Sequence, residues 1–155
     1  MKHNQLTLLF LVKKDSVLLA MKKRGFGVGR WNGVGGKVEE NETTERAAVR
    51  ECKEEINVTP IKFQKVATVT FNEIHGGERK TLNVTVYLCT KWSGTPVETE
   101  EMRPQWFKKT NIPYDNCWSD DKYWLPLILE GKKIKANFIM SDHDEVASYT
   151  LSEVE

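Results

Sequence analysis

The sequence predicts an α+β protein in which strands lie on both sides of one acidic helix. Residues 43–56 carry apolar side chains at helical spacing, whereas the segments before and after them are apolar runs or alternate between apolar and polar residues. Strands and helices do not alternate regularly along the chain, which argues against a parallel α/β sheet. The 155 residues match the length of one domain, so we expect a single domain over residues 1–155.

The first half predicts two strands, a glycine-rich loop and the helix. Residues 6–12 and 16–21 are apolar and are separated by the turn Lys13-Lys14-Asp15. Six of the ten glycines follow within residues 25–36, where we expect a loop that adopts unusual conformations or closely approaches another group. Thr43 can cap the helix over residues 43–56, and Asn57 can adopt the left-handed conformation that ends it before Pro60.

The second half predicts more strands, a second helix and a closing hairpin. The alternation of Leu82, Val84 and Val86 is typical of a strand. Ser119 or Asp120 can cap the second helix, in which Pro126 predicts an irregularity. The expected ranges are strands 61–71, 81–91 and 105–108, a helix ending near residue 130, hairpin strands 132–141 and 145–151, and a loop at His75-Gly76-Gly77.

The composition excludes several classes of function. Lysine and arginine number 23 against 22 aspartates and glutamates, so the protein lacks the basic excess typical of domains that bind duplex nucleic acid. The apolar run from Leu8 to Val12 is too short to span a membrane. Cys52, Cys89 and Cys117 form no metal-type cluster, and their odd number indicates reduced thiols. We expect a cytoplasmic monomer that binds neither a membrane nor duplex nucleic acid.

Three glutamates of the predicted helix follow one another at i, i+3 and i+4, namely Glu51, Glu54 and Glu55. Like charges at this spacing destabilise an isolated helix. One interpretation is a solvated acidic face. The glycine-rich segment just before the helix favours the other, a site for a hard divalent cation such as Mg²⁺, which prefers oxygen ligands. Arg50 could orient a neighbouring carboxylate through charge-assisted hydrogen bonds.

Residues 36–58 resemble a known motif. They read G-x5-E-x7-R-E-C-K-E-E-I-N-V, which resembles the Nudix box, G-x5-E-x7-R-E-U-x-E-E-x-G-U, where U is a bulky aliphatic residue. Every charged position matches; Cys52 replaces an aliphatic residue, and Asn57 replaces the last glycine. Residues 21–27, 29–33, 94–98, 101–104 and 118–124 extend the resemblance to the MutT type of the Nudix hydrolase superfamily, over residues 6–154.

The resemblance implies the Nudix fold, an α+β fold with mixed β-sheets between helices (α/β/α). It also implies Mg²⁺-dependent hydrolysis, with Mn²⁺ as a substitute, of oxidised purine nucleoside triphosphates such as 8-oxo-dGTP and 2-hydroxy-dATP. The products are the monophosphate and pyrophosphate, and the reaction keeps mutagenic precursors out of DNA. The implied catalytic residues are Arg50, Glu51, Glu54 and Glu55, and the implied metal ligands are the Gly35 carbonyl, Glu51, Glu54, Glu55 and Glu101. Glu54, Glu55 and Glu101 stay alternatives for the general base.

The resemblance further implies a base-binding site. Asn32, Asp120 and Asp121 match residues that hydrogen-bond the purine edge, and Trp118 matches one that stacks on the ring. The other implied substrate-binding residues are Thr7, Lys22, Phe26, Val34, Gly35, Gly36, Lys37, Phe71, Leu82 and Met102. If the two aspartates are buried together, one is expected to be protonated. The alternative interpretation is a helix N-cap with an acidic first turn.

Two other functions stay open at this point. A Nudix hydrolase could instead cleave an unmodified or methylated purine triphosphate or a dinucleoside polyphosphate. A Nudix-fold binding module without turnover is the third hypothesis, and the three intact glutamates argue against it.

Overall fold

Strands dominate the structure, a computed structural model that describes residues 4–75 and 77–155, without the side chain of His75. In this part of the chain the strands form two sheets, with the orders β4-β1-β6-β5-β8-β9 and β3-β2-β7. The strands are β1 (Gln5–Leu11), β2 (Ser16–Lys22), β3 (Trp31–Asn32), β4 (Val34–Lys37), β5 (Thr59–His75), β6 (Glu78–Ser93), β7 (Met102–Lys108), β8 (Lys133–Met140) and β9 (Val146–Val154). The helices are α1 (Thr44–Ile56), α2 (Asp121–Leu129) and the short 3₁₀ helix η2 (Tyr114–Asn116). The predicted α+β class is confirmed.

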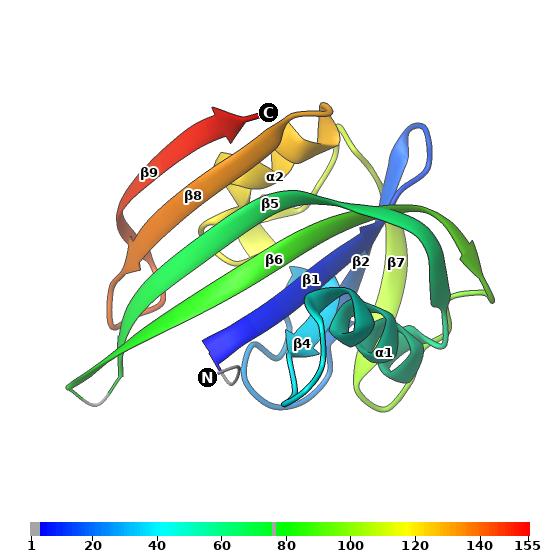
Figure 1. Cartoon of the computed structure of the whole chain (residues 1–155), viewed down its shortest axis with the longest axis horizontal. Helices are drawn as coiled ribbons and strands as arrows, with labels where there is room; N and C mark the ends of the chain where they lie inside the picture. The colour runs from blue at the N-terminus through cyan, green and yellow to red at the C-terminus, as the bar shows by residue number, and fades with distance from the viewer. Residues whose placement is uncertain (1–3, 76) are drawn as a thin grey trace.

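The large sheet is mixed, and the helices α1 and α2 lie on opposite sides of it (Figure 1). Strand β1 pairs antiparallel with β4 and parallel with β6. Its residues Leu8 and Phe10 pack in the core that contains α2 residues. Leu9 and Leu11 point the other way, into the core that contains α1 residues. Both faces of β1 are therefore buried, which is why its sequence is a continuous apolar run.

Helix α1 begins and ends where the sequence predicts. The Thr43 hydroxyl accepts a hydrogen bond of 3.1 Å from a backbone N–H of the first turn. At the other end, Asn57 adopts the left-handed conformation, with φ 61° and ψ 37°. Ala48, Cys52 and Ile56 are buried against the sheets, as their spacing predicts. The local signals therefore fix both the length of α1 and the side that faces solvent or ligand.

Several strand boundaries differ from the sequence prediction. The second half of the glycine-rich stretch forms β3 and β4, and β4 pairs with β1. The β5–β6 hairpin is longer than predicted, because antiparallel pairing continues through polar residues as far as His75 and Glu78. Gly76, in the predicted loop, lies outside the described residues. Strand β7 starts at Met102, since it pairs with β2 along its whole length. Hydrogen-bonded pairing, which extends beyond the apolar pattern, sets these ends.

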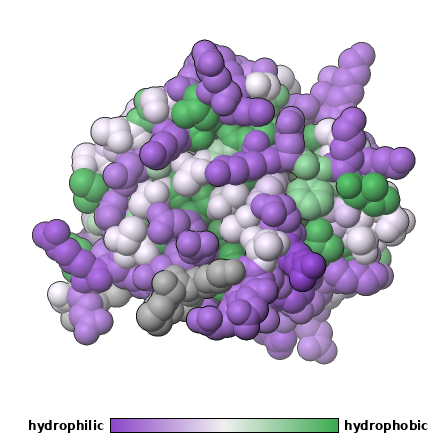
Figure 2. Space-filling view, in the orientation of Figure 1, coloured by the Kyte–Doolittle hydropathy of each residue, from purple (hydrophilic) through white to green (hydrophobic). Residues whose placement is uncertain are grey.

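Hydrophilic side chains cover most of the face seen in Figure 2, and hydrophobic side chains show there in separate patches. Most large apolar residues lie instead in the two cores on either side of β1. No helix in the described part of the chain is long and apolar enough to cross a membrane.

Candidate active site

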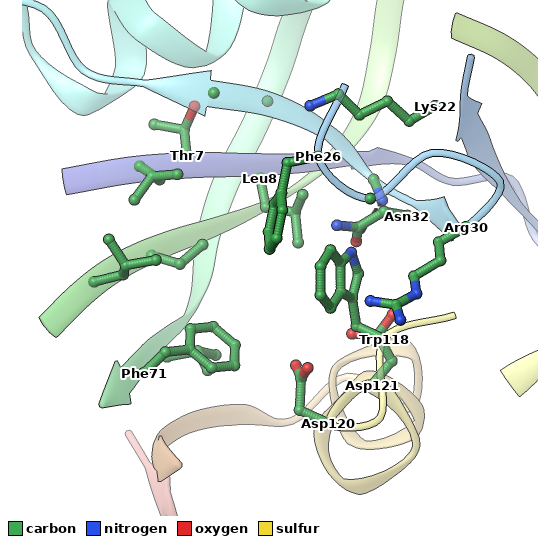
Figure 3. Close-up of a pocket in the computed structure, with 18 of the residues that line it drawn as sticks. Thr7, Leu8, Lys22, Phe26, Arg30, Asn32, Phe71, Trp118, Asp120 and Asp121 are labelled. Carbon is green, nitrogen blue, oxygen red and sulfur yellow. Dashed lines mark hydrogen bonds between the residues drawn. The ribbon is translucent and has the colours of Figure 1, made fainter. Parts of the chain in front are cut away.

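A cavity of about 260 Å³ is lined by residues from both sheets and from the segment that precedes α2 (Figure 3). The walls gather side chains that lie far apart in the sequence. Among the predicted substrate-binding residues, those that line it are Thr7, Lys22, Phe26, Asn32, Gly35, Gly36, Phe71, Leu82, Met102, Trp118, Asp120 and Asp121.

Two predicted substrate-binding residues lie elsewhere. Val34 is buried in the core that contains α1 residues, because successive residues of a strand point to opposite faces. Lys37 is exposed at the end of β4, and its carbonyl accepts a hydrogen bond of 3.0 Å from Arg50. The structure therefore turns Val34 away from the cavity and leaves Lys37 outside its wall.

Of the three predicted glutamates of α1, Glu55 lines the cavity beside β4, whereas Glu51 and Glu54 are not among the lining residues. Glu55 is 6% exposed, and its Oε1 accepts a hydrogen bond of 2.8 Å from the backbone N–H of Gly35. Burial raises the pKa of Glu55 to about 8 against the effect of that hydrogen bond, and the charges of Glu51 and Glu101 act in the same direction as burial. The carboxylate form of Glu55 is thus costly unless positive charge is added beside it.

Arg50 lies behind these glutamates, on the side away from the cavity wall. Its guanidinium donates to both carboxylate oxygens of Glu42, at 2.7 and 2.9 Å, and to Oε1 of Glu51 at 2.6 Å. A longer contact of 3.4 Å joins it to the exposed Glu54. Burial raises the pKa of Glu51, and the hydrogen bond from Arg50 opposes this shift. Arg50 thereby holds Glu42 and Glu51 in place and lowers the cost of ionising Glu51.

The oxygen-rich end of the cavity fits a hard divalent cation by its donor chemistry. A Cβ at Gly36 would lie 1.9 Å from Oε2 of Glu51, so only glycine leaves room for this carboxylate against β4. In the side-chain positions of the described residues, no group of three acidic, His or Cys side chains is arranged to hold a metal ion. Glu51 faces Arg50 and Glu55 faces Gly35, so binding requires these side chains to rotate toward the cation.

At the other end of the cavity, Asp120 and Asp121 are each 3% exposed. Asp120 Oδ2 accepts a hydrogen bond of 2.8 Å from the indole N–H of Trp124. Asp120 makes no side-chain hydrogen bond to the start of α2, and the Ser119 hydroxyl donates instead to the carbonyl of Asp144. Asp120 thus occupies the N-cap position and Asp121 the first turn, as the alternative interpretation predicts, but the Asp120 side chain makes no capping hydrogen bond.

The two aspartates differ in their affinity for a proton. Burial raises the pKa of Asp121 well above its ordinary range, and the neighbouring charge of Asp120 raises it further. Burial also raises the pKa of Asp120, whereas the hydrogen bond from Trp124 opposes that shift. These shifts favour a proton on Asp121 rather than on Asp120 where the two side chains meet. The pair offers a neutral donor and an acceptor within one cavity wall.

The charged residues and the tryptophan that line the cavity without having been predicted as site residues are Arg30, Glu73, Trp124 and Asp144. Trp124 carries a signal that could have identified it, because it lies one helical turn after Asp120 and has an indole donor. Asp144 belongs to the turn between β8 and β9, which no local pattern places near the other wall residues.

Comparisons with known proteins define the class. A family model described as NUDIX domain matches residues 1–150, so the chain belongs to the Nudix family of hydrolases. Nudix hydrolases generally use divalent metal ions. The resemblance seen in the sequence is confirmed.

Individual relatives sharpen this assignment. The chain is 45% identical over 149 residues to the oxidized purine nucleoside triphosphate hydrolase of Mus musculus, covering 96% of this chain and 94% of the relative. It is 43% identical over 150 residues to the protein of the same name from Danio rerio, covering 97% and 95%. Its fold matches the crystal structure of a MutT protein from Bacillus halodurans, with a TM-score of 0.85, 23% identity and coverage of 96% and 97%.

Proposed function

We propose that this protein hydrolyses oxidised purine nucleoside triphosphates, including 8-oxo-dGTP and 2-hydroxy-dATP, to the monophosphate and pyrophosphate. The observation that carries the proposal is one cavity lined by Glu55 of α1 and by a buried aspartate pair beside an aromatic side chain. The identity to two vertebrate enzymes named for this substrate class supports it. One domain over residues 1–155 carries the reaction, which removes mutagenic precursors from the nucleotide pool.

At the α1 end, the proposed cofactor is Mg²⁺, with Mn²⁺ as a substitute. Its ligands are the Gly35 carbonyl and the carboxylates of Glu51, Glu54, Glu55 and Glu101. When bound, the ion neutralises phosphate oxygens and lowers the pKa of a coordinated water. One carboxylate among Glu54, Glu55 and Glu101 accepts the proton of the attacking water. Lys22 in the cavity wall and Lys37 outside it contribute positive charge to the phosphates.

At the α2 end, the purine edge hydrogen-bonds Asn32, Asp120 and Asp121, and the ring stacks on Trp118. Phe26, Phe71, Leu82 and Met102 form the apolar walls. The Asn32 Oδ1 accepts the backbone N–H of Gly33 at 2.9 Å, and in the described residues its amide N–H groups have no acceptor. A protonated Asp121 beside Asp120 lets one cavity read the edges of both 8-oxoguanine and 2-hydroxyadenine.

The Thr7 hydroxyl supports a polar ligand between these two ends. Thr7 is 2% exposed and pairs with Gly36 across β1 and β4. Its Oγ1 is, among the described residues, the one buried side-chain nitrogen or oxygen atom without a hydrogen-bond partner. Such an atom costs about 1–3 kcal/mol unless it is satisfied. A nucleotide that spans the cavity supplies the missing partner.

A nucleotide panel assayed by pyrophosphate release tests the proposal. We expect the highest kcat/KM with 8-oxo-dGTP and 2-hydroxy-dATP, complete loss with a chelator, and recovery on addition of Mg²⁺. Equal or better turnover of unmodified or methylated purine triphosphates or of dinucleoside polyphosphates would favour another Nudix substrate. Nucleotide binding without pyrophosphate release in Mg²⁺ would favour a binding module.

We also propose that the protein acts as a cytoplasmic monomer that binds neither membranes nor duplex nucleic acid. The near balance of 23 basic and 22 acidic residues and the three free, buried cysteines support this proposal. Light scattering at several protein concentrations tests the oligomeric state, and a mass near twice 17.9 kDa contradicts it.

A further inference from the structure

Arg30 is a cation in the cavity wall that contacts an aromatic ring. It lies directly before β3, and its guanidinium carbon is 4.1 Å from the centroid of the Trp118 ring. Among the described residues, the guanidinium forms no ion pair, and the side chain with which it interacts is the Trp118 indole. Figure 3 shows Arg30 on one side of Trp118, with Phe26 and Phe71 on the other. Arg30 thus covers the side of the indole that is turned away from the apolar walls.

Trp118 has few other restraints. It lies between η2 and α2 outside regular secondary structure, next to an isolated bridge that joins Cys117 to Trp31. Its indole N–H makes no hydrogen bond to a described residue. Contacts with one segment, residues 26–30, therefore set the orientation of the ring.

That segment surrounds the indole on several sides. Phe26 lies with its ring centroid 5.2 Å from that of Trp118, at an interplanar angle of 36°. Gly27 has φ 86°, and a Cβ there would lie 2.9 Å from Cζ2 of Trp118. The backbone N–H of Arg30 donates to the Gly27 carbonyl at 3.1 Å, which fixes the start of the Arg30 side chain relative to this close approach.

We propose that Arg30 is a positioning residue of the base site, whose guanidinium stacks on one face of Trp118 and holds the indole in the orientation in which it lines the cavity for the purine. The inference rests on the proposed function and adds a residue that need not touch the substrate. A planar guanidinium suits this role, because it stacks on an indole face while its charge is attracted to the ring. Since Arg30 lies at the base end of the cavity, its loss changes substrate binding rather than the chemical step.

Arg30→Gln and Arg30→Lys test the role, with Lys13→Gln as the matched control. Lys13 Nζ lies 4.3 Å from the ring centroid of Trp106, and neither residue lines the cavity. Arg30→Gln is expected to raise KM for 8-oxo-dGTP about two- to fivefold, the effect of a partly exposed cation–π contact, with kcat unchanged. Arg30→Lys recovers part of the loss, and Lys13→Gln leaves KM at the wild-type value. A fall in kcat without a change in KM overturns the proposal.

Acrylamide quenching of tryptophan fluorescence gives a second readout that needs no substrate. The contribution of Trp118 to the fluorescence is the fluorescence of each protein minus that of the same protein carrying Trp118→Phe. Arg30→Gln is expected to increase the quenching of this contribution, and Lys13→Gln to leave it unchanged. Equal quenching in wild type and Arg30→Gln overturns the positioning role. A wild-type protein that does not hydrolyse 8-oxo-dGTP refutes the proposed function instead, and the quenching result still decides the contact.

Discussion

The two ends of the cavity both bury carboxylates, and the protein compensates their charge in different ways. At the α1 end, Arg50 donates to Glu42 and Glu51, and its hydrogen bond opposes the rise that burial causes in the pKa of Glu51. At the α2 end, Asp120 and Asp121 have no ion pair within the described residues; Asp121 keeps a proton, and Trp124 donates to Asp120. Burial favours the protonated form at both ends, since it also raises the pKa of Glu55 to about 8, and a cation bound beside Glu55 would reverse this shift. The two ends therefore differ in the partner of the carboxylates, a guanidinium beside Glu51 in one case and a second carboxyl beside Asp121 in the other.

The largest expected effect lies at the α1 end. Glu54→Gln removes a proposed ligand and candidate base, and we expect kcat to fall about 100-fold or more, as for general base catalysis. Pyrophosphate release at saturating Mg²⁺ measures it. Glu45→Gln, an exposed position in the first turn of the same helix, is the control and should keep wild-type activity. A Glu54→Gln variant as active as wild type would contradict the role of the α1 carboxylates.

The equivalent change at the α2 end affects recognition. Asp120→Asn and Asp121→Asn are each expected to lower kcat/KM for both oxidised purines about tenfold or more, because hydrogen bonds in a buried site are left unpaired. Initial rates with 8-oxo-dGTP and 2-hydroxy-dATP measure this effect. If both variants keep wild-type kcat/KM for both nucleotides, the aspartate pair does not read the base.

A smaller effect, on stability, is expected from removing the hydrogen bond between Trp124 and Asp120. Trp124→Phe keeps a buried ring and removes the N–H that binds Asp120, at a cost of about 1–3 kcal/mol in the free energy of unfolding. Urea denaturation measures it. Trp31→Phe is the control, since Trp31 is also buried and its indole N–H makes no hydrogen bond to a described residue. Equal losses in the two variants would mean that ring size, and not the hydrogen bond, stabilises the protein.

The smallest effect is a dependence of stability on pH. Above the ordinary aspartate pKa of 3.8, the unfolded chain releases the Asp121 proton while the folded protein retains it. Wild type therefore loses stability as pH rises, until the raised pKa of the folded state is passed. The free energy of unfolding of Asp121→Asn should exceed that of wild type by a margin that grows upward from about pH 4. A margin that is flat or shrinks over this range contradicts the proton on Asp121.

The sequence predicted the α1 end better than the α2 end for a physical reason. Thr43, Asn57 and the glutamates of α1 act within one short segment, so helical spacing and capping rules suffice to place them. Trp118 and Asn32 share a cavity because separate strands and loops bring them together, which only the family resemblance anticipated. Strand β4 escaped prediction because its two glycines carry no apolar pattern, and β3 because it has only the two residues Trp31 and Asn32. The stacking of Arg30 on Trp118 joins two irregular segments and leaves no periodic signal.

Strand β4 is one of the two edge strands of the large sheet, and it also supplies Gly35 and Gly36, next to which Glu55 and Glu51 lie. Outermost strands open at lower free energy than central ones, because neighbours hold them on one side only. Gentle heating should therefore separate β4 from β1, and with it Gly35 and Gly36 from the glutamates of α1, while the cores around β1 are still intact. Activity would then be lost at a lower temperature than the unfolding transition measured by circular dichroism. Loss of activity would therefore be the earlier sign of thermal damage to this protein.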